Sequence, residues 1–263
     1  MNKIIHVYAI GDLHGDHRAV RNFTQRNIKL HKDIANGDDN VLVCLGDFGG
    51  NFFFNHRDEA FKSKLSRYPF TYFVIRGNHE ERPSICREKN PNKWHLEAFL
   101  GNTVYVEDAY PYIKYALDTP AVYTIAGMFT FVIPGAYSVD KYKRLECGWS
   151  WFENEQLDDK EMELGLHLVE HYNKEFDLVL SHTCPICFEP TDLFLSCVDQ
   201  FMVDKTMERY LGSIEYNIKY KHWLWGHYHA NRIYPDGKCI MLFEQAIDLE
   251  ALKKEEVLYE DLI

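Results

Sequence analysis

The sequence of 263 residues lacks a run of about 18 or more apolar residues, which excludes a conventional transmembrane helix. It also lacks a signal-peptide core, because Met1 to His6 lead into a short apolar segment without a small-residue cleavage site. The seven cysteines are odd in number and scattered, which does not suggest a disulfide framework. We therefore expect a cytoplasmic chain with reduced thiols and no membrane partner.

Basic residues are scarce beside acidic ones: 29 Lys and Arg stand against 40 Asp and Glu, for a formal net charge of −11. A field of that sign repels polyanions, which disfavours long nucleic acids as partners, and no basic run offers a nuclease groove. The chain has no Gly-, Ser- or Pro-rich linker and no repeat. We expect one domain spanning residues 1–263, with 184–220 as a possible cap or insertion over the site.

The N-terminal part alternates strand-like and helix-like segments. Apolar runs at 4–10, 41–45 and 70–75 predict strands, and 16–29 and 59–67 between them predict helices. Strands followed by helices favour an α/β fold with a parallel sheet and crossover connections.

The middle of the sequence changes character. Runs rich in Val, Ile, Tyr and Phe at 103–106, 110–115, 121–125 and 128–133 predict short strands, which we expect to form an antiparallel sheet. Farther on we expect helices at 158–174 and 204–220, strands at 178–180 and 223–225, and a hairpin around Asp236-Gly237.

Polar side chains follow five of these apolar runs. They are Asp12 and His14, Asp47, Asn78 and His79, His182, and His227 with His229. In open α/β sheets, ligands bind at the carboxyl ends of strands, so these residues are expected at one edge. Residues two apart in extended chain point the same way, so each Asp-x-His or His-x-His pair can offer two ligands to one side.

Carboxylate, imidazole and amide donors without thiolate suit Mn, Fe, Zn, Co or Ni. Seven ligands are too many for one catalytic ion with open positions, but they fit two ions that share a bridging carboxylate. Such a pair can clamp a phosphoryl group and lower the pKa of a bridging water, so that hydroxide exists as a nucleophile near neutral pH. We expect two divalent ions, with Mn²⁺ favoured.

The blocks Gly11-Asp12-Leu13-His14-Gly15, Gly46-Asp47, Gly77-Asn78-His79-Glu80, Ser181-His182 and Gly226-His227-Tyr228-His229 resemble those of the calcineurin-like metallophosphoesterases. The resemblance implies a four-layer α/β/β/α sandwich of two mixed sheets flanked by helices, and a dinuclear metal centre. It implies that Asp12, His14 and His229 hold the first metal, that Asp47 bridges, and that Asn78, His182 and His227 hold the second.

The same resemblance implies that His79 is a catalytic histidine that stabilises the transition state or protonates the leaving oxygen. The first and third blocks look like the phosphoprotein phosphatase branch, and 134–152 resembles a stretch of bacterial and phage-type members. However, Gly50 stands where that branch has a carboxylate that orients the histidine, and Asn51 stands where it has a phosphate-binding Arg. Arg76 is then a candidate catalytic and phosphate-binding residue, and Arg144 a second phosphate-binding candidate.

Several alternatives stay open from the sequence. The substrate is expected to be phosphorylated and can be a small molecule, a nucleotide or a phosphoprotein. Monoester hydrolysis is favoured over diester or nuclease activity, and a non-catalytic metal-stabilised scaffold is the competing class.

A lone Cys184-x-x-Cys187 pair is weak support for zinc or redox chemistry and is better read as shaping the loop after His182. Phe52 to Phe54, Trp149, Trp151 and Phe152 could line a substrate pocket or pack in the core.

Overall fold

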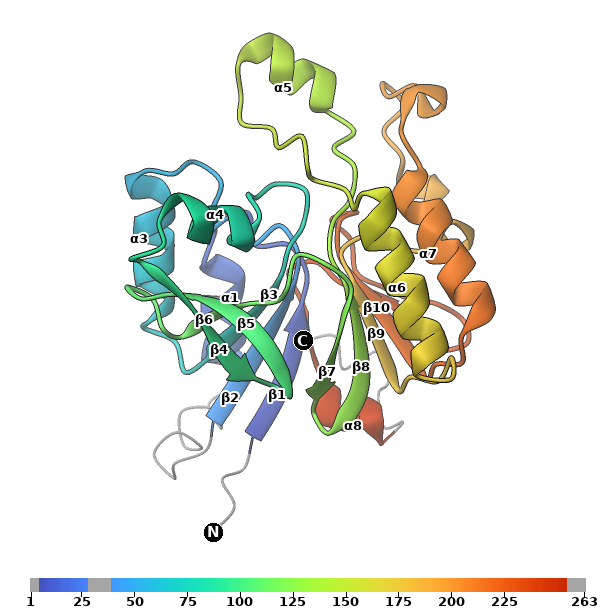
Figure 1. Cartoon of the computed structure of the whole chain (residues 1–263), viewed down its shortest axis with the longest axis horizontal. Helices are drawn as coiled ribbons and strands as arrows, with labels where there is room; N and C mark the ends of the chain where they lie inside the picture. The colour runs from blue at the N-terminus through green and yellow to red at the C-terminus, as the bar shows by residue number, and fades with distance from the viewer. Residues whose placement is uncertain (1–4, 28–38, 255–263) are drawn as a thin grey trace.

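Two β-sheets stacked face to face carry helices on their outer faces, as Figure 1 shows for this computed structural model, which describes residues 5–27 and 39–254. The first half of the chain contributes β1 (Ile5–Ile10), α1 (Arg18–Arg26), β2 (Asp39–Leu45), α3 (His56–Leu65), β3 (Thr71–Ile75), α4 (Pro83–Lys89), β4 (Trp94–Phe99), β5 (Asn102–Glu107), β6 (Ile113–Tyr115), β7 (Ala121–Ile125) and β8 (Met128–Ile133). The second half contributes α5 (Lys141–Cys147), α6 (Asp159–His171), β9 (Leu178–Ser181), the 3-10 turns η1 (Ile186–Phe188), η2 (Thr191–Leu193) and η3 (Gln200–Met202), α7 (Thr206–Asn217), β10 (His222–Trp225), β11 (Arg232–Ile233), β12 (Cys239–Met241), β13 (Ala246–Asp248) and α8 (Leu249–Lys253).

Both sheets are mixed. The seven-stranded sheet has the order β13-β1-β2-β3-β6-β5-β4, in which β1, β2, β3 and β6 are parallel. The six-stranded sheet has the order β11-β12-β10-β9-β8-β7, in which β12, β10, β9 and β8 are parallel. The parallel strands therefore occupy the centre of each sheet, and their carboxyl ends define one edge of the sandwich.

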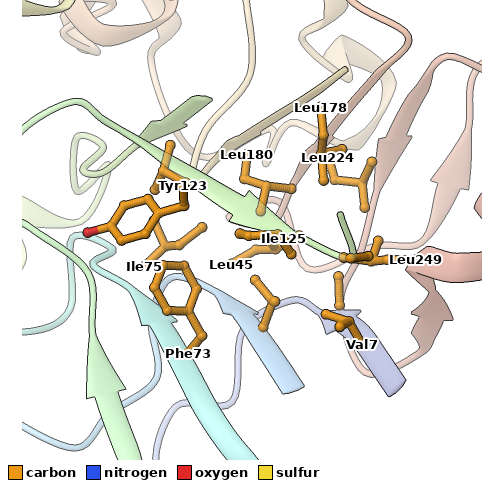
Figure 2. Close-up of a cluster of buried hydrophobic side chains, with 14 of the residues drawn as sticks. Val7, Leu45, Phe73, Ile75, Tyr123, Ile125, Leu178, Leu180, Leu224 and Leu249 are labelled. Carbon is orange, nitrogen blue, oxygen red and sulfur yellow. The ribbon is translucent and has the colours of Figure 1, made fainter. Parts of the chain in front are cut away.

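The main hydrophobic core lies between the two sheets. Figure 2 shows Val7, Leu45 and Ile75 from one sheet facing Ile125 and Leu180 from the other, all fully or almost fully buried. A second core joins the outer face of the seven-stranded sheet to α1, α3 and α4, and a third joins the six-stranded sheet to α6 and α7. The four-layer α/β/β/α sandwich of two mixed sheets is thus confirmed. None of the described helices is long and apolar enough to cross a lipid bilayer.

The expectation of an antiparallel sheet in the middle of the chain is met for neighbouring strands but not for the sheet as a whole. β4 pairs antiparallel with β5, β5 with β6, and β7 with β8, but these strands divide between the two mixed sheets. β5 and β6 extend the first sheet, where β6 pairs parallel with β3, whereas β7 and β8 belong to the second sheet, where β8 pairs parallel with β9. Strand composition shows that a segment is extended but does not specify its pairing partner, because pairing depends on long-range packing. The expected hairpin around Asp236-Gly237 is confirmed as β11 and β12.

Some elements give little sequence signal. β4 is an edge strand whose residues are mostly exposed, and α5 buries no residue at all, so neither shows the apolar periodicity that predicts structure. The helix expected at 16–29 is present as α1. Residues 28 and 29 of the expected range lie outside the described chain.

The 184–220 segment has two parts. The three 3-10 turns lie before α7, and α7 itself buries Met207, Leu211 and Ile214 in the same core as Trp223 of β10. Residues from 206 onward therefore form the outer helical layer. In Figure 1, α5 and the orange turn near residue 200 project on the same side of the sandwich, which leaves residues 185–205 as the part that can border a site at that edge.

Candidate metal centre

The strand-end residues predicted from the sequence meet at one edge of the sandwich. Asp12 follows β1, Asp47 follows β2, and Asn78 and His79 follow β3 of the first sheet. His182 follows β9, and His227 and His229 follow β10 of the second sheet. The structure therefore joins the carboxyl ends of five parallel strands from both sheets into one cluster.

Two buried carboxylates stand at the centre of the cluster. Asp12 accepts hydrogen bonds from the backbone N–H of His227 at 2.9 and 3.1 Å, which ties β1 to β10. Asp47 Oδ1 accepts from the backbone N–H of His79 at 2.8 Å. Both side chains are only 2% exposed, so water provides almost no compensation for their charge.

Three overlapping sets of donor atoms surround these carboxylates, and within each set the donors lie within 4.8 Å of one another. They are Asp12, His14 and His229; His14, Asp47 and His79; and Asp12, Asp47 and His182. Asp12 and Asp47 each belong to two sets, which is the arrangement that two neighbouring cations would require. His79, predicted as a catalytic group, also falls within reach of a cation. His227 belongs to none of these sets in the described chain.

A hydrogen bond from Nδ1 fixes the orientation of the His182 ring. Its Nδ1 donates to the carbonyl oxygen of Leu45 at 2.7 Å, so Nε2 is turned toward Asp47 Oδ1 at 3.3 Å and Asn78 Oδ1 at 2.9 Å. A backbone acceptor of this kind fixes the tautomer of a metal-binding histidine. His14 Nε2 and His229 Nε2 face each other at 2.8 Å.

Asn78 is held in the same manner. Its amide nitrogen donates to Ser138 Oγ at 2.9 Å, and Ser138 Oγ in turn donates to Glu155 Oε2 at 2.5 Å. This chain points the amide oxygen of Asn78 into the cluster. Ser138 and Glu155 were not found from the sequence, because nothing in their local pattern links residues 78, 138 and 155.

The backbone of the cluster is strained. His14, Asp47, His227 and His229 all have positive φ, between 44° and 69°. Non-glycine residues adopt this region rarely and at a cost, and such residues concentrate at functional sites. Gly46 and Gly77 allow the close approach: a Cβ at Gly46 would lie 2.0 Å from His182 Nδ1, and one at Gly77 would lie 2.2 Å from Asp47 Oδ1.

The charges of the cluster are unbalanced without a cation. Burial raises the pKa of Asp12 to about 7. Burial also opposes the charge of Asp47, but His79 and His182 outweigh it and hold the pKa of Asp47 well below its usual range. For His182, burial opposes protonation, yet Asp47 and Asp12 raise the pKa to about 9. A divalent cation among these groups would replace the proton of His182 and stabilise both carboxylates, so the donor set fits metal ions.

The remaining imidazoles are already in the form that binds metal. Burial lowers the pKa of His14 to about 4, lowers that of His229 and lowers that of His227 well below its usual range. They are therefore neutral near pH 7, with lone pairs available to a cation.

A small cavity of about 190 Å³ opens beside the cluster, lined by His14, His79, Phe52 and Arg144 with Gly49 and Phe53. Arg144 reaches it from α5, with Nε bonded to Asp140 Oδ1 at 2.7 Å and Nη1 to the carbonyl oxygen of Ser150 at 3.3 Å. The same Asp140 oxygen lies 4.0 Å from His79 Nε2. Asp140 is thus a carboxylate near the histidine that the sequence analysis missed, since it comes from a part of the chain 61 positions beyond His79.

Arg76 does not reach this cavity, which corrects its expected role as a phosphate clamp. Its side chain is 2% exposed, and Nη1 donates to the carbonyl oxygens of Glu155 at 2.7 Å and Gly77 at 3.1 Å. Nε lies 3.8 Å from Asp118. The Arg76 guanidinium is therefore held by backbone oxygens near Asp118, and Arg76 does not line the cavity.

The Cys184-x-x-Cys187 pair forms no disulfide, and both residues are free thiols. Cys184 is a buried residue of the loop after His182, and its Sγ lies 3.4 Å from the hydroxyl oxygen of Tyr228. Burial raises the pKa of the Cys184 thiol well above its usual range, which disfavours the thiolate that metal binding or redox exchange needs.

The model of the calcineurin-like phosphoesterases matches residues 5–231, which is most of the chain. This protein belongs to that family. Together with the donor sets above, the family makes it a metal-dependent phosphoesterase. No curated protein matches the sequence.

Two solved structures are similar to this chain at low identity, and of these only the first has a TM-score above 0.5. The protein TT1561 of Thermus thermophilus is 15% identical, with a TM-score of 0.51 over 95% of this chain and 96% of the other. The phosphopantetheinyl hydrolase PptH of Mycobacterium tuberculosis is 13% identical, with a TM-score of 0.43 over 98% of this chain and 95% of the other. At these identities the likeness concerns the fold alone.

Metal binding should release protons, and the number of protons released per ion bound should fall as pH rises. At a pH below about 7, binding displaces protons from both His182 and Asp12, whereas above the pKa of His182, about 9, neither carries one to release. The apparent affinity for Mn²⁺ should therefore increase between about pH 6 and pH 9. Calorimetry in two buffers of different ionisation enthalpy measures both quantities.

His167→Gln is the matched control for this titration, because His167 is exposed on α6 and belongs to none of the donor sets. That variant should release the same number of protons as the unchanged protein, and His182→Gln should release fewer. Mn²⁺ affinity that does not vary with pH would contradict the charge balance described here.

Proposed function

We propose that this protein is a dinuclear-metal-dependent phosphatase that hydrolyses phosphate monoesters in the cytoplasm. The observation that carries the proposal is the sharing of Asp12 and Asp47 between overlapping donor sets, directly beside a cavity that holds an imidazole and a guanidinium. The seven free cysteines support a reducing compartment.

We assign the donors to the two ions as the sequence blocks suggest. Asp12, His14 and His229 would hold one ion, Asn78, His182 and His227 the other, and Asp47 would contact both. When bound, two divalent ions, for which we favour Mn²⁺, would supply Lewis-acid stabilisation of phosphoryl oxygens and activation of water. The ring of His227 lies beside that of His182, with ring centres 5.0 Å apart, and the backbone N–H of His227 donates to Asp12.

His79 is placed to act on the leaving group. It lines the cavity, and its Nδ1 lies 3.6 Å from Asp47 Oδ2 while Nε2 is directed toward Asp140. Burial lowers the pKa of His79, so its imidazolium gives up a proton more readily than an ordinary one. We assign to Nε2 the proton that is transferred to the departing alkoxide oxygen.

Arg144 is the phosphate-binding residue in this proposal. Its hydrogen bonds to Asp140 and Ser150 use Nε and Nη1, so Nη2 is the group available to a phosphate oxygen. The guanidinium carbon also lies 5.8 Å from the ring centre of Phe52, which holds the side chain against the cavity wall. A dianionic monoester would gain more from this cation than a monoanionic diester, which favours the monoester.

Hydrolysis of p-nitrophenyl phosphate and of bis(p-nitrophenyl) phosphate with added Mn²⁺ tests the proposal. We expect faster release from the monoester and loss of release with a chelator. Asp47→Asn should lower kcat by at least about 100-fold because it removes the shared charge, whereas the surface control Asp192→Asn should keep full activity. Faster diester release would make the protein a phosphodiesterase, and no release from either ester would favour a metal-stabilised scaffold.

Asp140 is expected to position His79. Asp140→Asn should lower kcat roughly ten-fold with little change in KM, and the loss should be greater for alkyl esters than for p-nitrophenyl phosphate, because poor leaving groups depend more on the proton from His79. Glu146→Gln, which changes an exposed carboxylate on the same helix, is the control. An equal loss with good and poor leaving groups would show that Asp140 acts only by holding Arg144.

A further inference from the structure

A second cavity, of about 300 Å³, opens at His227 and His229 of the candidate metal centre. His227 and His229 form one wall, and the remaining walls come from Tyr137 and Val139 before α5 and from the turns between residues 193 and 208. Its volume is at the lower end of the range for small-molecule pockets. A group bound at the metal centre would therefore have this cavity directly beside it.

The walls beyond the histidines are largely apolar. Val139, Leu193, Phe194, Leu195, Val198 and Val203 line the cavity. Leu195 is 62% exposed, Val139 46% and Leu193 40%, so apolar side chains at this position contact water. Covering such surface with an apolar group is favourable by about 25 cal/mol per Å². The cavity therefore favours an occupant that is itself apolar.

The charged groups of this cavity do not suit an anion. Lys205 is paired with Glu189 at 2.6 Å, and its ammonium also lies over the ring of Phe194. Asp204 and Glu208 add two carboxylates to the lining. With its one lysine paired and two carboxyl groups in its lining, the cavity offers no unpaired cation to a further phosphate or carboxylate group.

We propose that the substrate is the phosphate ester of an uncharged apolar alcohol, an alkyl or aryl group of which the second cavity accepts. This inference rests on the proposed phosphatase function and narrows its substrate class. The phosphate lies at the metal centre near Arg144, and the carbon chain leaves it past His227 and His229 into the apolar walls. Nucleotides and acidic phosphopeptides are poor substrates, since they bring further negative charge or polar groups to Asp204 and Glu208.

The test uses the Mn²⁺-loaded protein and methyl, butyl, hexyl and octyl phosphate below their micelle-forming concentrations, with release of inorganic phosphate as the signal. We expect kcat/KM to rise by about four-fold per methylene until the cavity is full, the fold-change that corresponds to about 0.8 kcal/mol. Adenosine monophosphate should be hydrolysed less efficiently than hexyl phosphate. A rate independent of chain length, or a preference for the nucleotide, overturns the inference.

Two tryptophan variants locate the effect. Val203→Trp fills the cavity and should lower kcat/KM for octyl phosphate by about ten-fold or more while leaving methyl phosphate unchanged. Met202→Trp adds the same bulk at the adjacent exposed position, which does not line the cavity, and should change neither. Val198→Trp is a second filling variant in case Val203→Trp unfolds. Equal loss with both esters overturns the inference.

Binding of methylphosphonate and octylphosphonate by calorimetry separates the cavity from the chemistry. If octylphosphonate binds more tightly than methylphosphonate and Val203→Trp abolishes the difference, the apolar cavity is supported. If, in addition, no ester is hydrolysed, only the phosphatase function is refuted. Hydrolysis of all esters with equal affinity for both phosphonates would refute only the inference.

Discussion

The edge of the sandwich that carries the metal donors depends on two buried carboxylates, which no lysine or arginine in the described part of the chain neutralises. Asp12 and Asp47 lie where the parallel strands of both sheets end, and their neighbours are backbone N–H groups and imidazoles. Burial of uncompensated charge is costly, so this arrangement is stable only with protons or cations between the carboxylates. The strained backbone at His14, Asp47, His227 and His229 adds to that cost. Both costs are explained if the cluster exists to hold metal ions.

The two sheets divide the tasks of the site. The first sheet supplies both carboxylates and His79, and the second supplies His182, His227 and His229. The shared core between Val7, Leu45 and Leu180 fixes the distance between the sheets and thus between the donors. Segments with little buried surface, α5 and the 3-10 turns, border the two cavities. A rigid centre with variable borders is the usual arrangement by which one fold serves many substrates.

The α/β character of the chain and the cluster at the strand ends follow from local signals, whereas the four-layer sandwich was expected only from the resemblance of the sequence blocks to a known family. Apolar runs that end in Asp, Asn or His specify which strand ends carry chemistry, and parallel topology brings these ends together. Strand pairing in the middle of the chain was not predictable, because β6 and β8 join different sheets through long-range packing. Asp140 was missed and Arg76 misassigned for the same reason. The proximity of Asp140 to His79 and the contact of Arg76 with the carbonyl oxygen of Glu155 both depend on the path of the 134–155 segment, which local signals do not show.

The central claim is that Asp12 and Asp47 organise two ions in one site. Electron paramagnetic resonance of the protein titrated with Mn²⁺ tests it most directly, because two ions that share a carboxylate at roughly 3.5–4 Å are magnetically coupled. We predict that the second equivalent of Mn²⁺ produces a coupled spectrum, and that Asp47→Asn binds Mn²⁺ without coupling. Saturation at one equivalent, or two ions without coupling in the unchanged protein, would contradict the account.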